Sequence, residues 1–174
     1  LILNKLGAET SAYYYMAMMI ATLLFTIPQA ASNSLFAEGS HNEKEIKEHV
    51  KKAIKIISLL LIPAILVIVF LGQYVLLLFG KQYSLEGFRF LQLLAVSGIF
   101  AAINNVSGTL LRVKKRIKSL IFVSILNAIL ILGLSWMVID KGLLGIGYAW
   151  VIGQAFVSGV YLLSWAGGGE WQRS

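Results

Sequence analysis

Long apolar segments alternate along the chain with short clusters of charged residues. Five stretches without any charged residue are each longer than the roughly 18–20 residues that a helix needs to cross a bilayer. The pattern therefore predicts an all-α fold, a polytopic membrane helix bundle with about five transmembrane helices. The predicted spans cover about 11–37, 54–79, 87–111, 118–139 and 143–165, and a polar tail follows over 166–174.

The composition supports a membrane solvent. Hydrophobic residues make up 58% of the 174 residues and charged residues only 13%, and the mean hydropathy is +0.80. A soluble helical protein can contain one such apolar segment in its core, but five in succession favour a membrane protein. The chain has no cysteine, which excludes disulfides and thiolate metal sites.

Basic residues gather in two of the four loops, after the first and the third predicted span. Because Lys and Arg of short loops stay on the cytoplasmic side, these two loops share that side. The prediction is a multi-pass protein of the cytoplasmic membrane with its N-terminus outside and its C-terminus inside. The net charge of +7 then reflects topology and attraction to anionic lipid, and no nucleic-acid partner is expected. The clustered residues are Lys44, Lys47, Lys51, Lys52, Lys55, Arg112, Lys114, Lys115, Arg116 and Lys118.

Neutral polar residues recur at helical spacing inside four of the spans. The clearest stripe, in the first span, has intervals of 4, 3 and 4 residues, which place its members on one helical face. Two interpretations stay open: amides and small residues that pack helices together in lipid, or side chains that line a water-filled cavity. The second predicts these cavity-lining candidates: Thr22, Thr26, Gln29, Asn33, Asn104, Asn105, Asn127 and Gln154.

Two prolines lie inside predicted spans, Pro28 in the first and Pro63 in the second. Each removes a backbone donor and opposes the preceding helical turn, so we expect helix kinks at both positions. Bent helices often border cavities in transporters, because the freed carbonyl groups there can meet water or a neighbouring side chain.

Ionisable residues are absent from the middle of every span, which argues against a proton relay or a metal site in the membrane. His41 and His49 fall in a lysine-rich loop and are expected to be solvated. No hydrolase, phosphate-binding or paired-carboxylate motif is present, so we expect no catalytic residue, no metal and no cofactor, and we do not expect an enzyme.

Several blocks of the chain resemble the C-terminal half of polysaccharide flippases, the lipid-linked oligosaccharide transporters related to multidrug extruders. The blocks cover nearly all of residues 1–165, and Leu143 and Gly147 depart slightly from the usual glycine-rich turn of the family. They read LNKLGAETSAYYYMAMMI, IPQAASNSLFAE, KAIKIISLLLIPAILVIVFLGQYVLLLFGKQY and ILNAILILGLSWMVIDKGLLGIGYAWVIGQ.

The resemblance implies a carrier of two six-helix lobes around a central cavity, with this chain supplying most of one lobe. The partners it implies are membrane lipid, a lipid-linked glycan as substrate, and a missing N-terminal lobe of the same protein. The chain starts at LILNKLGAET without Met or a secretory signal, so we expect it to be a fragment. On this hypothesis Gln29, Asn33 and the Pro28 kink line the cytoplasmic mouth of the cavity, opposite Asn104 and Asn105.

Two alternatives remain open. A drug or organic-cation extruder of the same fold would favour an acidic residue in its cavity, and this part of the chain has none within a span. A non-transporting membrane scaffold subunit is the other alternative.

Overall fold

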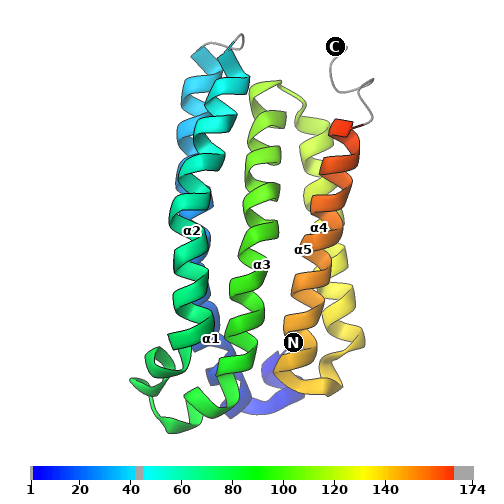
Figure 1. The fold of residues 1–174 in the computed structure, drawn as a ribbon. Coiled ribbons are helices and arrows are strands. Elements are labelled where there is room, and N and C mark those ends of the chain that lie inside the picture. Colours follow the sequence, from blue (N-terminus) through cyan, green and yellow to red (C-terminus); the bar gives the residue numbers. More distant parts are fainter. Residues whose placement is uncertain (1, 42–44, 167–174) are drawn as a thin grey trace.

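A computed structural model describes residues 2–41 and 45–166, and these residues form a bundle of long helices (Figure 1). Every predicted transmembrane segment corresponds to one helix that is long and apolar enough to cross a membrane. No strand occurs among the residues described, and the predicted all-α bundle is confirmed. The elements are α1 (Ile2–His41), α2 (Ile46–Leu77), α3 (Lys81–Val113), α4 (Ile117–Met137), the short 3₁₀ turn η2 (Ile139–Lys141) and α5 (Gly142–Ala166).

The helices do not end exactly where the predicted spans end. The spans 54–79 and 118–139 each run two residues past the ends of α2 and α4, because the chain turns there. Gly80 and Gly142 make these turns possible, since their φ angles of +130° and +68° are readily adopted only by glycine. Of the predicted tail, Ala166 ends α5 and residues 167–174 lie outside the described residues, as does Lys44.

The central element is α3, which packs against α1, α2 and α5. In its most apolar window 56% of the residues are buried, compared with 11% in α4, which packs mainly on α5. Figure 1 shows the α1–α2 and α3–α4 connections at one end of the bundle and the start of α1 at the other. The lysine-rich segments that flank those two connections therefore lie at the same end, which we call the basic end.

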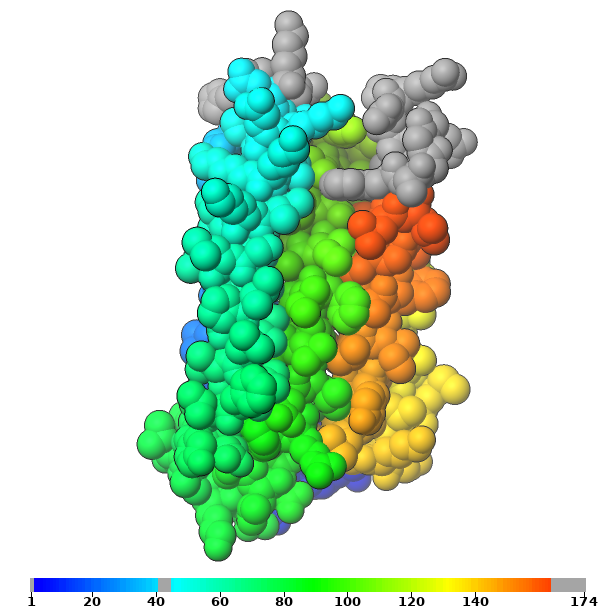
Figure 2. Space-filling view, viewed as in Figure 1, coloured from blue at the N-terminus to red at the C-terminus, as the bar shows by residue number. Residues whose placement is uncertain are grey.

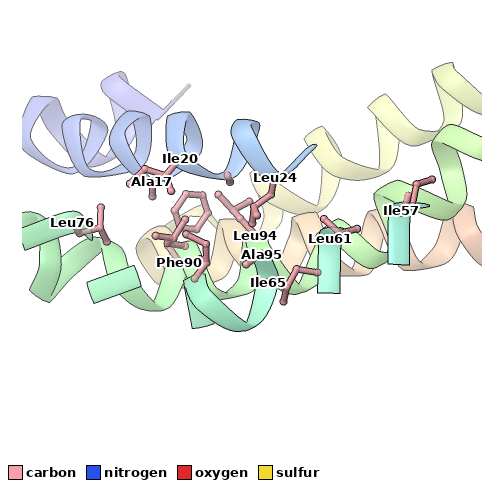
Figure 3. Packing of buried hydrophobic residues seen from close by; sticks show 14 of the residues in the cluster. Ala17, Ile20, Leu24, Ile57, Leu61, Ile65, Leu76, Phe90, Leu94 and Ala95 are labelled. Carbon is pink, nitrogen blue, oxygen red and sulfur yellow. The ribbon is translucent and has the colours of Figure 1, made fainter. Parts of the chain in front are cut away.

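An apolar core joins α1, α2 and α3 (Figure 3). Phe90, Leu94 and Ala95 of α3 are almost completely buried in it. Ala17 of α1 is completely buried, and such a small side chain allows the two helix backbones to approach closely. The residues facing them recur every three or four positions and include Ile20, Leu24, Ile57, Leu61 and Ile65.

Both proline-containing helices continue through their prolines. Pro28 is buried and Pro63 is exposed, and neither interrupts its helix. The non-helical dihedral angles inside α1 occur instead at Gly7, at φ 85° and ψ 172°, a position that we did not single out from the sequence. The kinks expected at Pro28 and Pro63 stay predictions.

Candidate functional site

A polar cavity of about 250 Å³ lies among α1, α3, α4 and α5. Helix α3 contributes the most residues, and it packs extensively against both α1 and α5. The side chains around it are mostly amides, hydroxyls and small residues. They are Gln29, Ser32, Asn33, Ala101, Asn104, Asn105, Gly108, Thr109, Arg112, Leu120, Val123, Ser124, Asn127, Gln154, Val157 and Tyr161.

Six of the eight residues named from the sequence line this cavity, although they come from four helices: Gln29, Asn33, Asn104, Asn105, Asn127 and Gln154.

Thr22 and Thr26 do not belong to this lining. Both are exposed on α1 nearer the other end of the bundle, and each hydroxyl bonds to its own helix. Thr22 Oγ1 donates to the Met18 carbonyl at 2.8 Å, and Thr26 Oγ1 donates to the Leu23 carbonyl at 2.6 Å. The predicted stripe on α1 is therefore divided, with its half near the basic end on the cavity and its other half outside it.

A hydrogen-bonded network joins α3 to α5 at the cavity wall. Asn104 Nδ2 donates to Gln154 Oε1 at 2.6 Å and lies 3.2 Å from the Gln154 carbonyl oxygen. The Ser158 hydroxyl lies 3.0 Å from Asn104 Oδ1, and Asn105 Nδ2 donates to the Ala101 carbonyl at 2.9 Å. The amides of Asn104 and Gln154 thus hold two helices together as well as lining the cavity.

Two polar atoms at the cavity have no hydrogen-bond partner among the described residues. They are Ser32 Oγ, in a side chain that is only 3% exposed, and Asn127 Oδ1. A buried polar atom without a partner costs about 1–3 kcal/mol. The cavity volume corresponds to about eight water molecules. Water or a polar ligand in the cavity would satisfy both atoms.

The eight candidates named from the sequence leave out several lining residues. Ser124 and Tyr161 share helical stripes with Asn127 and Gln154 in the sequence, and both line the cavity. Arg112 counted only as a loop charge, yet it follows Asn105 by seven residues, which is two helical turns on one face of α3. The cavity therefore includes one cation at the basic end.

Ionisable groups outside the cavity form a contact between α1 and α2 at the basic end. Glu38 Oε2 lies 2.8 Å from His49 Nδ1, and Lys52 Nζ donates to Glu38 Oε1 at 3.0 Å. His49, which we expected to be solvated, is thus partly buried in an ion-pair cluster. Within the described ranges, no group of three or more His, Cys, Asp or Glu could hold a metal ion.

Comparison with known protein families identifies the family of this chain. Residues 1–137 match the model of the MatE family. The chain belongs to the MatE family. The resemblance to the flippase superfamily, of which MatE is part, is therefore confirmed. The described residues include five helices long and apolar enough to cross a membrane, so the chain is a multi-pass membrane protein of a transporter family.

A curated relative from Shigella flexneri carries the name "Putative O-antigen transporter". It is 24% identical over 169 residues, which cover 95% of this chain and 40% of that protein. The chain thus spans about two fifths of the length of the relative that it matches. No solved structure matches the chain.

Proposed function

We propose that this chain forms part of one lobe of a carrier that flips lipid-linked oligosaccharide or polysaccharide repeat units across the cytoplasmic membrane by alternating access. The observation that carries the proposal is a polar cavity inside a bundle of membrane-spanning helices, with unsatisfied polar atoms in its wall. The name of the Shigella flexneri relative supports a glycan cargo.

The chemistry of the lining suits sugar hydroxyls. Amides and hydroxyls both donate and accept hydrogen bonds, as sugar hydroxyls do. The volume of about 250 Å³ is slightly below the roughly 300–1,000 Å³ of ordinary small-molecule sites. The cavity would therefore hold a single sugar residue, and the remainder of the repeat unit would lie between the two lobes.

The charges around the cavity favour this cargo over an organic cation. Among the described residues that line the cavity there is no carboxylate, and a buried cation would need one. Arg112 instead supplies a positive charge at the basic end. In this proposal Arg112 contacts an anionic group of the cargo, such as the phosphate that joins the glycan to its lipid.

The exposure of the whole α1 stripe supports the presence of a second lobe. Thr22, Thr26, Gln29 and Asn33 are all exposed on α1, and polar side chains that face lipid are costly. A second lobe on this face would remove the stripe from lipid and place it at the central cavity. With the basic end in the cytoplasm, as the distribution of lysines favours, the polar cavity opens toward the cytoplasmic half of the membrane.

The test uses Asn33→Leu and Asn105→Leu in the complete protein. Both residues line the cavity, and neither belongs to the Asn104–Gln154 pair. Export of glycan repeat units to the outer face should fall at least several-fold, while the abundance of the protein stays unchanged. Gln73→Leu, which removes an exposed amide of α2 outside the lining, is the matched control.

The same strains separate the alternatives. Normal glycan export in both cavity variants would mean that these amides only pack helices. Loss of resistance to organic cations with normal glycan export would favour a drug extruder. Glycan export that is unchanged when the whole gene is deleted would favour a scaffold subunit.

A further inference from the structure

A second hollow lies on the other side of α3. It is a groove of about 270 Å³ between α2 and α5 with α3 as its floor, and Figure 2 shows the surface of α3 between these two helices. Apart from two serines, its side chains are aliphatic. They include Ile54, Ile57, Leu61 and Ile62 of α2, Ile103 of α3 and Leu162 of α5.

The groove lies in one half of the membrane. Its α2 wall extends over residues 54–62, a rise of about 12 Å along the helix. The hydrocarbon core of a bilayer is about 30 Å thick, so this wall stays within one leaflet. That leaflet is the one next to the basic end, because α2 begins there at Ile46.

Two lysines continue the same face of α2 beyond the groove. Lys47, Lys51, Ile54 and Ser58 follow one another at intervals of 4, 3 and 4 residues, which keeps them on one helical stripe. Both lysines are exposed, and neither forms an ion pair with another residue in the described part of the chain. Positive charge therefore stands at the end of the groove where a phospholipid headgroup would lie.

We propose that the groove binds one acyl chain of an anionic phospholipid, with the lipid headgroup on Lys51 and Lys47. An aliphatic groove excludes water and favours a hydrocarbon chain. Basic residues beside a crevice between membrane helices, on the cytoplasmic side, are a recognised means of holding anionic headgroups. Neither the aliphatic groove nor the pair of lysines alone selects this ligand. The helical spacing of α2 places both on one face of the helix, so that a single phospholipid can contact both.

This lipid is separate from the cargo. Every residue of α3 from 106 to 111 is buried, so the helix forms a continuous wall between the groove and the polar cavity. A lipid seated in the groove cannot place its headgroup in the cavity on the far side of that wall. The inference therefore stands independently of the glycan proposed as cargo.

The experiment places the purified complete protein in nanodiscs of phosphatidylcholine and phosphatidylglycerol. A trace of either lipid carries a photoactivatable group in its acyl chain, and the labelled peptides are mapped. Phosphatidylglycerol should label residues 54–62 and 99–107 several-fold more than phosphatidylcholine does. Lys51→Gln should lower this labelling about fivefold, whereas Lys118→Gln, an exposed lysine at the basic end on α4, should leave it unchanged.

A second pair of variants tests the apolar half. Ser58→Phe fills the groove from an exposed lining position and should abolish labelling by both lipids. Leu59→Phe, also exposed but outside the lining, should not. Equal labelling by the two lipids, or labelling that is uniform over all exposed residues of α2, would overturn the proposal. A groove that stays unlabelled while the rest of α2 is labelled would overturn it too, because another helix would then cover the groove.

Discussion

Two hollows beside α3, the polar cavity and the apolar groove, differ in chemistry far more than in size. The polar cavity has a volume of about 250 Å³ and the apolar groove about 270 Å³. Ala101, Asn104 and Asn105 line the first, whereas Ala102, Ile103 and Val106 line the second. A shift of one or two positions along a helix turns a side chain to another face. One helix thus supplies both walls.

The comparison also shows which hollow needs a ligand. In a membrane, lipid chains fill an apolar groove at little free-energy cost. The aliphatic side chains of the groove therefore need no specific ligand. Polar atoms such as Ser32 Oγ and Asn127 Oδ1 have no such solvent, and they remain costly until water or a polar ligand reaches them. The polar cavity is therefore the more informative of the two about function.

The largest effect is expected where α5 packs closely against α4. A Cβ atom added at Gly153 of α5 would lie 2.7 Å from Ile131 Cγ1 of α4, so Gly153→Val should push the helices apart. Overpacking of this kind costs about 1–3 kcal/mol. Thermal unfolding in detergent measures the loss, and Gly159→Ala, where nothing lies within 4 Å, should cause none. Equal stability of the two variants would show that α4 is not held at this contact.

The next effect concerns the network that joins α3 to α5. Asn104→Leu removes the donor to Gln154 and leaves a side chain that is only 8% exposed without its partner. The free energy of unfolding should fall by about 1–2 kcal/mol, and lipid labelling of the groove should persist. An unchanged unfolding curve would mean that Gln154 finds another partner.

A variant that affects function without reducing stability sharpens the comparison. Asn127→Leu removes the unpaired Oδ1 and makes one wall of the polar cavity resemble the groove. Stability should be unchanged or raised, because an unsatisfied acceptor is lost, while glycan export falls several-fold. A clear loss of stability with normal export would assign Asn127 to packing.

The smallest effect is expected on the part of the α1 stripe that lies outside the cavity. The Thr22 hydroxyl already donates its proton to the Met18 carbonyl at 2.8 Å, so it could only accept a hydrogen bond from a ligand. Thr22→Val should change glycan export by less than about twofold. A reduction as large as that of Asn33→Leu would extend the site along α1 to Thr22.

Much of the architecture could be predicted because the membrane imposes simple rules. Crossing a bilayer requires about 20 apolar residues with every backbone group paired, so the five spans can be recognised from the sequence. Because successive helices cross in opposite directions, the first and third loops are also predicted to lie at the same end of the bundle. Helix ends were less predictable, because the turns depend on positive φ angles at Gly80 and Gly142 rather than on hydrophobicity.

The polar character of the candidate site could be predicted from the sequence, but the full set of residues that line it could not. Helical spacing showed which side chains share one face of a helix, and this was enough to select Gln29, Asn33, Asn105 and Asn127. Spacing within one helix carries no information about which helix lies opposite. For that reason it could not separate Thr22 from Gln29, nor show that Arg112 reaches the cavity.

By itself the sequence determined that the chain lies in a membrane, how many helices cross it and which face of each helix is polar. These properties follow from the transfer free energy of the side chains and from the period of the helix. The tertiary structure decided which faces meet. It paired Asn104 with Gln154 across 50 residues, left Ser32 and Asn127 with unsatisfied atoms at one cavity, and placed an aliphatic groove behind the same helix. Such contacts depend on how four helices pack against one another, and no local pattern along the chain encodes them.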